Sequence, residues 1–205
     1  MLTRAGIVGR PNVGKSTFFN CLLGRSRAIV GDFAGVTRDY KEEILDLKNF
    51  QIQLVDTAGL KSSPITEQDK MINKHTLNLI DHLDIILFVI DAREGVTLED
   101  REIFQVCRKL NKCTILVANK VETTSIEERF LQEDTNFFGL DNIFCVSSEH
   151  KLGIENVINT LIDICEENQF QSIKEERIDH EKKPINIAIV GRPNVGKSTL
   201  VNSII

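Results

Sequence analysis

The letters GRPNVGKST at residues 9–17 constrain this chain more than any other stretch of it. They contain the spacing G-x-x-x-x-G-K-S and stand between an apolar run and a segment with helical periodicity. Glycine has no Cβ, so backbone N–H groups can close around phosphate oxygens, and the following helix points its positive end at the same anion. Gly9, Gly14, Lys15 and Ser16 therefore predict a phosphate-binding loop, in which Lys15 neutralises phosphate and Ser16 ligates Mg²⁺.

The letters IVGRPNVGKST occur twice, at residues 7–17 and again at 189–199, so a Gly-rich turn without function is a poor alternative. We expect residues 1–168 to form a first complete domain and residues 169–183 a charged linker, unless the latter extend the last helix. Residues 184–205 would be the incomplete start of a second domain, which stops before any further motif. We expect no functional second site there. A deliberately shortened chain, a truncated gene and a partial sequence would each explain this end.

Short apolar runs alternate with segments of helical period, which indicates the α/β fold of a P-loop NTPase. We expect a mainly parallel six-stranded sheet with helices on both faces. One strand should be antiparallel, because only Lys48 and Asn49 separate its run from the next one. Residues 25–40 have no clear period and are interpreted as a mobile loop. Strands are expected at 3–9, 41–47, 50–56, 84–90, 113–118 and 142–147, and helices at 15–23, 66–82, 97–110, 124–136 and 153–166.

The helix that begins near residue 97 has a clear start signal, since Thr97 and Asp100 have the spacing of a capping pair. Its apolar residues recur at helical spacing and should form the face that packs on the sheet. They are Ile103, Val106, Cys107 and Leu110.

The remaining motifs follow predicted strands, and ligands of doubly wound sheets bind at the carboxyl ends of strands. In the run Asp56-Thr57-Ala58-Gly59, Asp56 can hold magnesium through water and the Gly59 N–H can reach a γ-phosphate. The pattern D-x-x-G alone has almost no specificity. When it follows a phosphate loop by about 40 residues, as here, it indicates a γ-phosphate and magnesium site. Thr37 is the best hydroxyl in the preceding loop to complete the metal shell, which would order that loop when γ-phosphate binds.

The segment Asn119-Lys120-Val121-Glu122 follows another predicted strand and is similar to the N-K-x-D pattern by which GTPases recognise guanine. The aspartate of that pattern accepts hydrogen bonds from guanine N1–H and from the exocyclic amine. Glu122 keeps the charge but adds one methylene. The alternative is that Glu122 is only the first exposed residue of a helix. Ser147-Ser148-Glu149, after the last strand, can supply a backbone N–H to the guanine carbonyl.

Composition excludes several classes of protein. A hydrophobic content of 41% and a charged content of 27% are ordinary for a soluble globular chain. The formal net charge is −5, whereas a protein that binds nucleic acid by itself usually carries a basic surface. The net charge therefore argues against an autonomous nucleic-acid binder. No apolar run approaches the length of a membrane span and no signal peptide is evident. The cysteines show no metal-ligand spacing, so we expect buried thiols in a reducing cytoplasm.

Together these residues resemble the translation-factor-related GTPases and, more narrowly, the EngA/Der family of tandem bacterial GTPases. The supporting letters cover almost the whole chain: GRPNVGKST twice, GVTRD at 35–39, DTAGL at 56–60, DIILFVIDAREGVTLED at 84–100, NKVE at 119–122 and SSEHKLGI at 147–154. The resemblance implies a Mg²⁺-dependent GTP hydrolase that acts in assembly of the large ribosomal subunit. It also implies a second GTPase domain and an RNA-contacting domain, which these residues do not include.

Two positions bear on the mechanism. Leu60 stands where small GTPases place a water-orienting Gln, so intrinsic hydrolysis should be slow. The resembled family shares this replacement, and there the residue matching Asn12 is thought to ligate a potassium ion that replaces an arginine finger. The alternative is that Asn12 only stabilises the loop. Arg38 is a weaker candidate for an internal finger, because it lies in the predicted mobile loop.

The sequence thus predicts a domain that binds GTP or GDP and hydrolyses GTP. The two alternatives are an ATP-using P-loop enzyme and a scaffold that binds nucleotide without hydrolysing it. Lys15, Thr37, Gly59 and Asn12 are assigned to catalysis, and Ser16, Thr37 and Asp56 to the metal. The residues assigned to the nucleotide are Gly9, Asn12, Val13, Gly14, Lys15, Ser16, Thr17, Asp56, Gly59, Asn119, Lys120, Glu122, Ser147 and Ser148.

Overall fold

The computed structural model describes residues 2–25, 41–57, 67–133 and 135–168. The chain divides into two compact units, Met1–Ile173 and Lys174–Ile205, and the whole second unit lies outside the described residues. The expected linker at 169–183 and the expected second domain start at 184–205 lie outside them as well, so both remain predictions.

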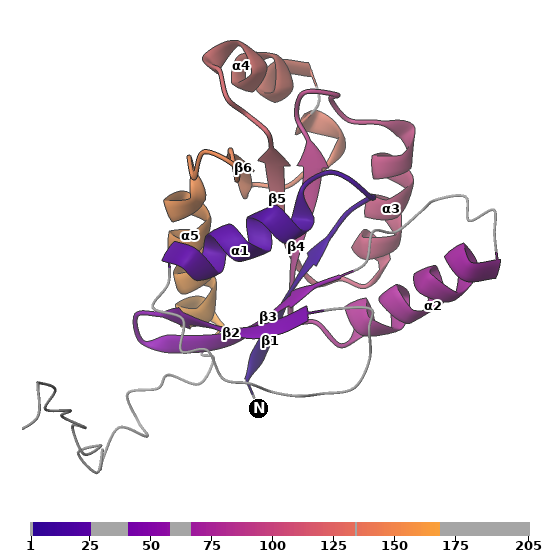
Figure 1. Cartoon of the computed structure of the whole chain (residues 1–205), viewed down its shortest axis with the longest axis vertical. Helices are drawn as coiled ribbons and strands as arrows, with labels where there is room; N and C mark the ends of the chain where they lie inside the picture. The colour runs from indigo at the N-terminus through magenta and orange to yellow at the C-terminus, as the bar shows by residue number, and fades with distance from the viewer. Residues whose placement is uncertain (1, 26–40, 58–66, 134, 169–205) are drawn as a thin grey trace, which may run out of the picture. The chain divides into compact units, whose positions relative to one another are not determined.

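A six-stranded sheet forms the centre of the first unit, in the order β2-β3-β1-β4-β5-β6 (Figure 1). Only β2 and β3 pair antiparallel, with Leu47 opposite Phe50 across the tight turn, and the other neighbours are parallel. The predicted mainly parallel sheet with one antiparallel strand is therefore confirmed. The strands are β1 Thr3–Val8, β2 Lys41–Leu47, β3 Phe50–Asp56, β4 Ile85–Asp91, β5 Cys113–Asn119 and β6 Ile143–Cys145.

Helices cover both faces of this sheet, as the alternating pattern predicts (Figure 1). Successive strand residues point to opposite faces, and β4 shows this clearly because all of its residues are buried. Leu87 and Val89 pack in one cluster with α1 and α5, whereas Ile86 and Phe88 pack in the other with α2, α3 and α4. The helices are α1 Lys15–Arg25, α2 Glu67–Asp81, α3 Leu98–Lys109, α4 Thr124–Glu133 and α5 Ile154–Glu167, with a 3₁₀ turn at Thr135–Phe137.

Helix α3 begins as predicted. The Thr97 side chain accepts a hydrogen bond from the Asp100 N–H at 3.2 Å, and Asp100 Oδ2 accepts one from the Thr97 N–H at 3.0 Å. The prediction of its buried face was wrong at Val106, which is exposed. Phe104 is buried instead, because its ring packs against Phe88 and Phe138 on the neighbouring elements.

Other boundaries differ by a few residues. Helix α1 continues through Gly24 to Arg25, because nothing at Gly24 interrupts the helical backbone. Helix α4 ends at Glu133, ahead of the predicted 136, and the chain continues beyond residue 134 as a 3₁₀ turn. Strand β6 is shorter than expected, since it pairs with β5 only from Ile143 to Cys145.

The cysteines follow the expectation in part. Cys21, Cys107 and Cys165 are buried, Cys145 is partly buried and Cys113 is exposed. Burial raises the pKa of Cys107 to about 12 and that of Cys165 to about 11, which keeps both as unreactive thiols at neutral pH. Within the described ranges, no helix is both long enough and apolar enough to span a membrane.

Candidate nucleotide-binding site

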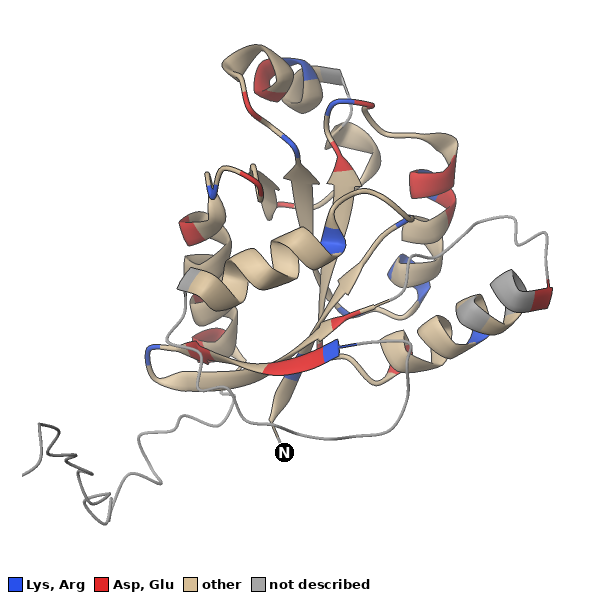
Figure 2. Cartoon of the chain, viewed as in Figure 1, with Lys and Arg blue, Asp and Glu red and all other residues tan. Residues whose placement is uncertain are grey.

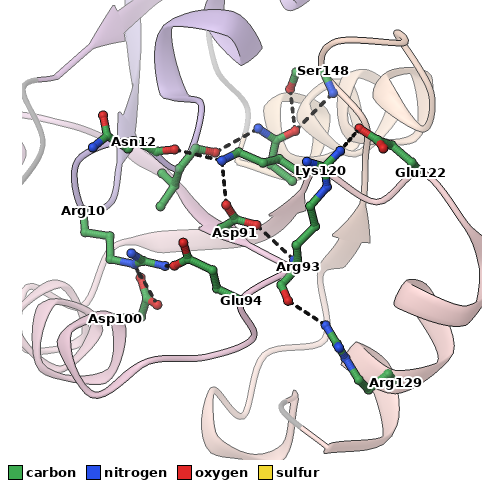
Figure 3. Close-up of polar contacts among 12 residues, drawn as sticks. Arg10, Asn12, Asp91, Arg93, Glu94, Asp100, Lys120, Glu122, Arg129 and Ser148 are labelled. Carbon is green, nitrogen blue, oxygen red and sulfur yellow. Dashed lines mark hydrogen bonds and ion pairs between the residues drawn. The ribbon is translucent and has the colours of Figure 1, made fainter.

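The predicted motifs meet at one edge of the sheet. Strands β1, β4, β5 and β6 run parallel, so their carboxyl ends lie side by side. The loop between β1 and α1, the segment after β4 and the loop between β5 and α4 all leave from this edge (Figure 3). Residues separated by up to 108 positions therefore contact one another directly.

The phosphate loop needs its glycines for two reasons: a backbone conformation that other residues rarely adopt, and a lack of space for a side chain. Gly14 has φ +94°, a left-handed conformation that L side chains rarely adopt. A Cβ on Gly14 would also overlap the Asn119 side-chain nitrogen, and one on Gly9 would overlap the Val89 carbonyl oxygen. The loop is thus packed closely against the ends of β4 and β5, where a side chain at either glycine would not fit.

Lys15 opens helix α1 and is only 7% exposed. Its Nζ donates a hydrogen bond to the Arg10 carbonyl at 2.9 Å. Burial lowers the pKa of Lys15 from 10.5 to about 8, against a smaller opposing effect of the Asp56 carboxylate. An incoming phosphate would favour the charged ammonium, so anion binding and protonation of Lys15 are coupled. Ser16 and Thr17 follow in the first turn of α1, and both side chains are exposed.

Asp56 ends β3 beside the phosphate loop, where Thr57 Oγ1 donates to the Ile7 carbonyl at 2.7 Å. The Asp56 side chain is buried, and its Oδ1 has no hydrogen-bond partner among the described residues. A buried carboxylate oxygen without a partner is costly unless something else binds it. A hard cation that prefers oxygen ligands would satisfy it, so this residue fits the predicted magnesium site.

Asn119 connects the phosphate loop, on one side of the site, to the loop after β6, on the other side (Figure 3). It is 1% exposed, and its Nδ2 donates to the Val13 carbonyl in the phosphate loop at 2.9 Å. Its Oδ1 accepts hydrogen bonds from the Ser148 N–H at 3.1 Å and from the Ser148 hydroxyl at 2.8 Å. One buried amide therefore joins the phosphate loop, the end of β5 and the loop after β6.

Lys120 makes a second connection. Its Nζ donates to the Asn12 carbonyl at 3.0 Å and pairs with Asp91 Oδ2 at 2.6 Å. Both Asn12 and Lys120 have φ +67°, in the left-handed region. The Lys120 side chain thus lies across the phosphate loop, with its charge balanced by the last residue of β4.

Glu122 lies at the outer side of the same loop, with its side chain 27% exposed. Its Oε1 forms an ion pair with Arg93, and His150 Nε2 lies 3.7 Å from the same oxygen. The hydrogen bond from Arg93 holds the pKa of Glu122 below its usual range, so the side chain is a carboxylate at neutral pH. Ser147 is buried nearby, and its backbone exchanges hydrogen bonds with Leu152.

A group of charged residues that the sequence motifs do not include also positions these loops. Arg10 Nε donates to both carboxylate oxygens of Asp100, at 3.1 and 3.2 Å, and its guanidinium also contacts Glu94. The segment from Asp91 to Asp100 therefore contacts the phosphate loop. The available signal was a run of charges directly after a buried strand, an arrangement that seldom marks a site on its own.

The structure brings together most of the predicted residues: Gly9, Asn12, Val13, Gly14, Lys15, Ser16, Thr17, Asp56, Asn119, Lys120, Glu122, Ser147 and Ser148. Thr37, Arg38, Gly59 and Leu60 lie outside the described residues, so their assigned roles remain predictions. Figure 2 shows lysines and arginines on several elements of the described part, interspersed with aspartates and glutamates.

The family described as 50S ribosome-binding GTPase matches residues 4–120 of this chain and matches again at residues 186–205. The chain belongs to this GTPase family. It is also 41% identical over 204 residues to GTPase Der of Thermotoga sp. strain RQ2, an alignment that covers 97% of the chain. The chain spans about half the length of this curated relative, 45%.

Solved structures of related GTPases share the fold. Era of Aquifex aeolicus bound to GDP and AlF₄⁻ superposes with a TM-score of 0.63 at 27% identity, over 79% of this chain and 56% of that one. A structure of Era with MgGDPNP and nucleotides 1506–1542 of 16S ribosomal RNA gives a TM-score of 0.58 at 32% identity, with the same coverage. The predicted P-loop GTPase fold and the predicted kinship with Der are thus confirmed.

Proposed function

We propose that this domain binds GTP and GDP and slowly hydrolyses GTP, as the switch domain of a ribosome-assembly GTPase. The observation that carries the proposal is the Asn119 amide, which joins Val13 in the phosphate loop to Ser148 in the loop after β6. A phosphate loop next to a base-recognition loop, at fixed separation, suits a purine nucleoside triphosphate. Catalysis would consist mainly of positioning and charge neutralisation.

On the phosphate side, Lys15 would neutralise the β- and γ-phosphates, and the backbone of Gly9 to Thr17 would bind the phosphate oxygens. Ser16 and Asp56 would hold Mg²⁺, with Thr37 and Gly59 added from segments outside the described residues. The unpartnered Asp56 Oδ1 supports this assignment. When bound, Mg²⁺ would neutralise charge that develops on the phosphate oxygens.

On the base side, Asn119 and Lys120 would frame the purine, and the Ser147-Ser148 backbone would donate to the guanine carbonyl. Glu122 would accept from the ring N1–H and the exocyclic amine, groups that adenine does not present in this arrangement. Its carboxylate state at neutral pH suits the role of an acceptor. Guanine rather than adenine is therefore the proposed base.

Binding is tested by calorimetry of the whole chain with GDP, with GTP and with ATP in the presence of Mg²⁺. We expect heat from the guanine nucleotides only, lost in Lys15→Ala and kept in Lys109→Ala, which removes an exposed lysine from α3. A preference for ATP would favour the alternative of an ATP-using enzyme. If Lys15→Ala bound as tightly as the parent, the site itself would be wrong.

Hydrolysis is tested separately by single-turnover phosphate release. Leu60 cannot orient water by hydrogen bonding, so we expect slow release, faster in K⁺ than in Na⁺ if a potassium ion binds at Asn12. Equal rates in the two salts would leave Asn12 with only a role in loop structure. Absence of release in either salt would favour a scaffold that binds nucleotide without hydrolysing it.

For the whole protein we propose a cytoplasmic location and the large ribosomal subunit as partner. The support is the family name and the kinship with Der, while the RNA seen with Era belongs to that protein. Sedimentation of the chain with ribosomal subunits, with GDP or a non-hydrolysable GTP analogue, tests this. Binding of neither subunit would show that these residues do not suffice.

A further inference from the structure

Arg93 reaches from the segment after β4 to Glu122 in the loop after β5, and it forms an ion pair with Glu122 Oε1 (Figure 3). The same oxygen has His150 Nε2 at 3.7 Å, so the attraction that Glu122 experiences is concentrated on one oxygen of its carboxylate. Arg93 is not one of the residues assigned to the nucleotide, and its side chain is 48% exposed. An exposed ion pair usually contributes little to stability. The position of the Arg93–Glu122 pair beside the base-recognition loop therefore suggests a role other than stabilising the fold.

The backbone around Arg93 is held on both sides. The Arg93 N–H donates to Asp91 Oδ1 at 3.0 Å, and Asp91 uses its other oxygen to bind Lys120. From helix α4, Arg129 Nη2 donates to the carbonyls of Ala92 at 3.0 Å and Arg93 at 2.9 Å. The Arg93 side chain therefore starts from a fixed backbone that is tied to both the base loop and α4.

Glutamate has one more rotatable bond than aspartate, and fixing such a side chain costs conformational entropy. A carboxylate that must accept two hydrogen bonds from one edge of a base needs a fixed orientation. An arginine that binds one of its oxygens fixes that orientation before the base arrives, which reduces the cost of binding.

We propose that Arg93 is a positioning residue that holds the longer Glu122 side chain in register with guanine and thereby sets selectivity for the exocyclic 2-amino group. The inference rests on the proposed function, since it assumes that Glu122 faces the base. The Arg93–Glu122 ion pair would thus compensate for the extra methylene group that glutamate has compared with aspartate.

The test compares GDP with inosine diphosphate, which lacks the 2-amino group, by competition against a fluorescent guanine nucleotide. Because the 2-amino group of guanine would donate a hydrogen bond to a charged acceptor, we expect the parent to prefer GDP by at least about tenfold. In Arg93→Ala we expect this ratio to fall by about three- to tenfold, mainly through weaker GDP binding. Arg93→Lys, which keeps the charge, should recover part of it.

Two further variants make the test specific. Arg4→Ala removes another arginine–glutamate pair, with Glu42, at the opposite end of β1, and should leave the ratio unchanged. In a Glu122→Asp background the shorter side chain no longer depends on Arg93, so adding Arg93→Ala should change the ratio by less than about twofold. A purely structural role for Arg93 would not produce this dependence on residue 122.

Three outcomes would overturn the inference. The first is an unchanged ratio in Arg93→Ala, and the second is tighter GDP binding, which would mean that Arg93 competes with the base. The third is a fall of equal size in both residue-122 backgrounds. A parent that binds GDP no better than ADP would contradict the proposed function and this inference together, whereas the first three outcomes leave the proposed function intact.

Discussion

The two halves of the site are built in different ways. On the phosphate side the contacts are made by backbone and buried groups: Gly14 lies against Asn119, and Lys15 binds the Arg10 carbonyl. On the base side the outer contact is an ion pair between two partly exposed side chains, Arg93 and Glu122. The first half is fixed by buried contacts and the second by an exposed ion pair, so substitutions should affect stability and binding differently in the two halves.

The largest expected effect is at Gly14, on the phosphate side. Gly14→Ala places a Cβ on the Asn119 amide at a positive φ, so the loop must shift. We expect GDP to bind on the order of 100-fold more weakly, measured by calorimetry.

Gly24→Ala is the matched control, because Gly24 lies in α1 and the added methyl group would point into open space. It should leave binding unchanged and stabilise the helix slightly. Equal losses in the two variants would contradict the steric account of the phosphate side.

The next effect is at Asn119, which joins the halves. Asn119→Ala leaves the Val13 carbonyl and both Ser148 donors without their partner, at a cost of about 1–3 kcal/mol in the free energy of unfolding. We expect about tenfold weaker GDP binding as well. Urea unfolding and calorimetry measure the two effects. The control is Asn156→Ala, at an exposed position of α5, which should change neither the stability nor the binding of GDP. If Asn119→Ala weakened GDP binding without lowering stability, Asn119 would not join the loops.

A third comparison uses one arginine from each half. Arg10→Met removes the counter-charge of Asp100, which is 0% exposed, and should lower the free energy of unfolding by about 1–3 kcal/mol. Arg93→Met should leave the urea midpoint almost unchanged, because its ion pair is exposed. If both variants were equally stable, burial would not distinguish the two halves.

The smallest effect is the dependence of phosphate binding on pH. Burial lowers the pKa of Lys15 to about 8 in the free protein, and we expect the charge of a bound phosphate to raise it again. Above that pH the bound state therefore holds more protons than the free state, so affinity falls by about fivefold between about pH 8 and 9. Calorimetry in buffers with different heats of ionisation would detect the accompanying proton uptake. An affinity independent of pH over this range would mean that Lys15 does not contact the phosphate.

The phosphate side could be predicted from the sequence because its determinants are contiguous. Gly9 to Ser16 form one run with the spacing of a phosphate loop, and the mainly parallel sheet follows from the alternation of strands and helices. The ion pairs that support the two halves could not be predicted in this way. Arg93 meets Glu122 at a separation of 29 positions and Arg10 meets Asp100 at 90, and only the folded sheet brings these pairs together. Val106 was misplaced for the same reason, because the packing of Phe104 against Phe88 and Phe138 sets the buried face of α3.

The Asn119 amide also has a consequence for the departure of a ligand. Its nitrogen and its oxygen bind different loops, so the opening of either loop alone must break a buried hydrogen bond of this amide. A molecule that spans both halves must be released from them together, in a single cooperative step. Dissociation should then be slow relative to that of a fragment carrying only the base or only the phosphates.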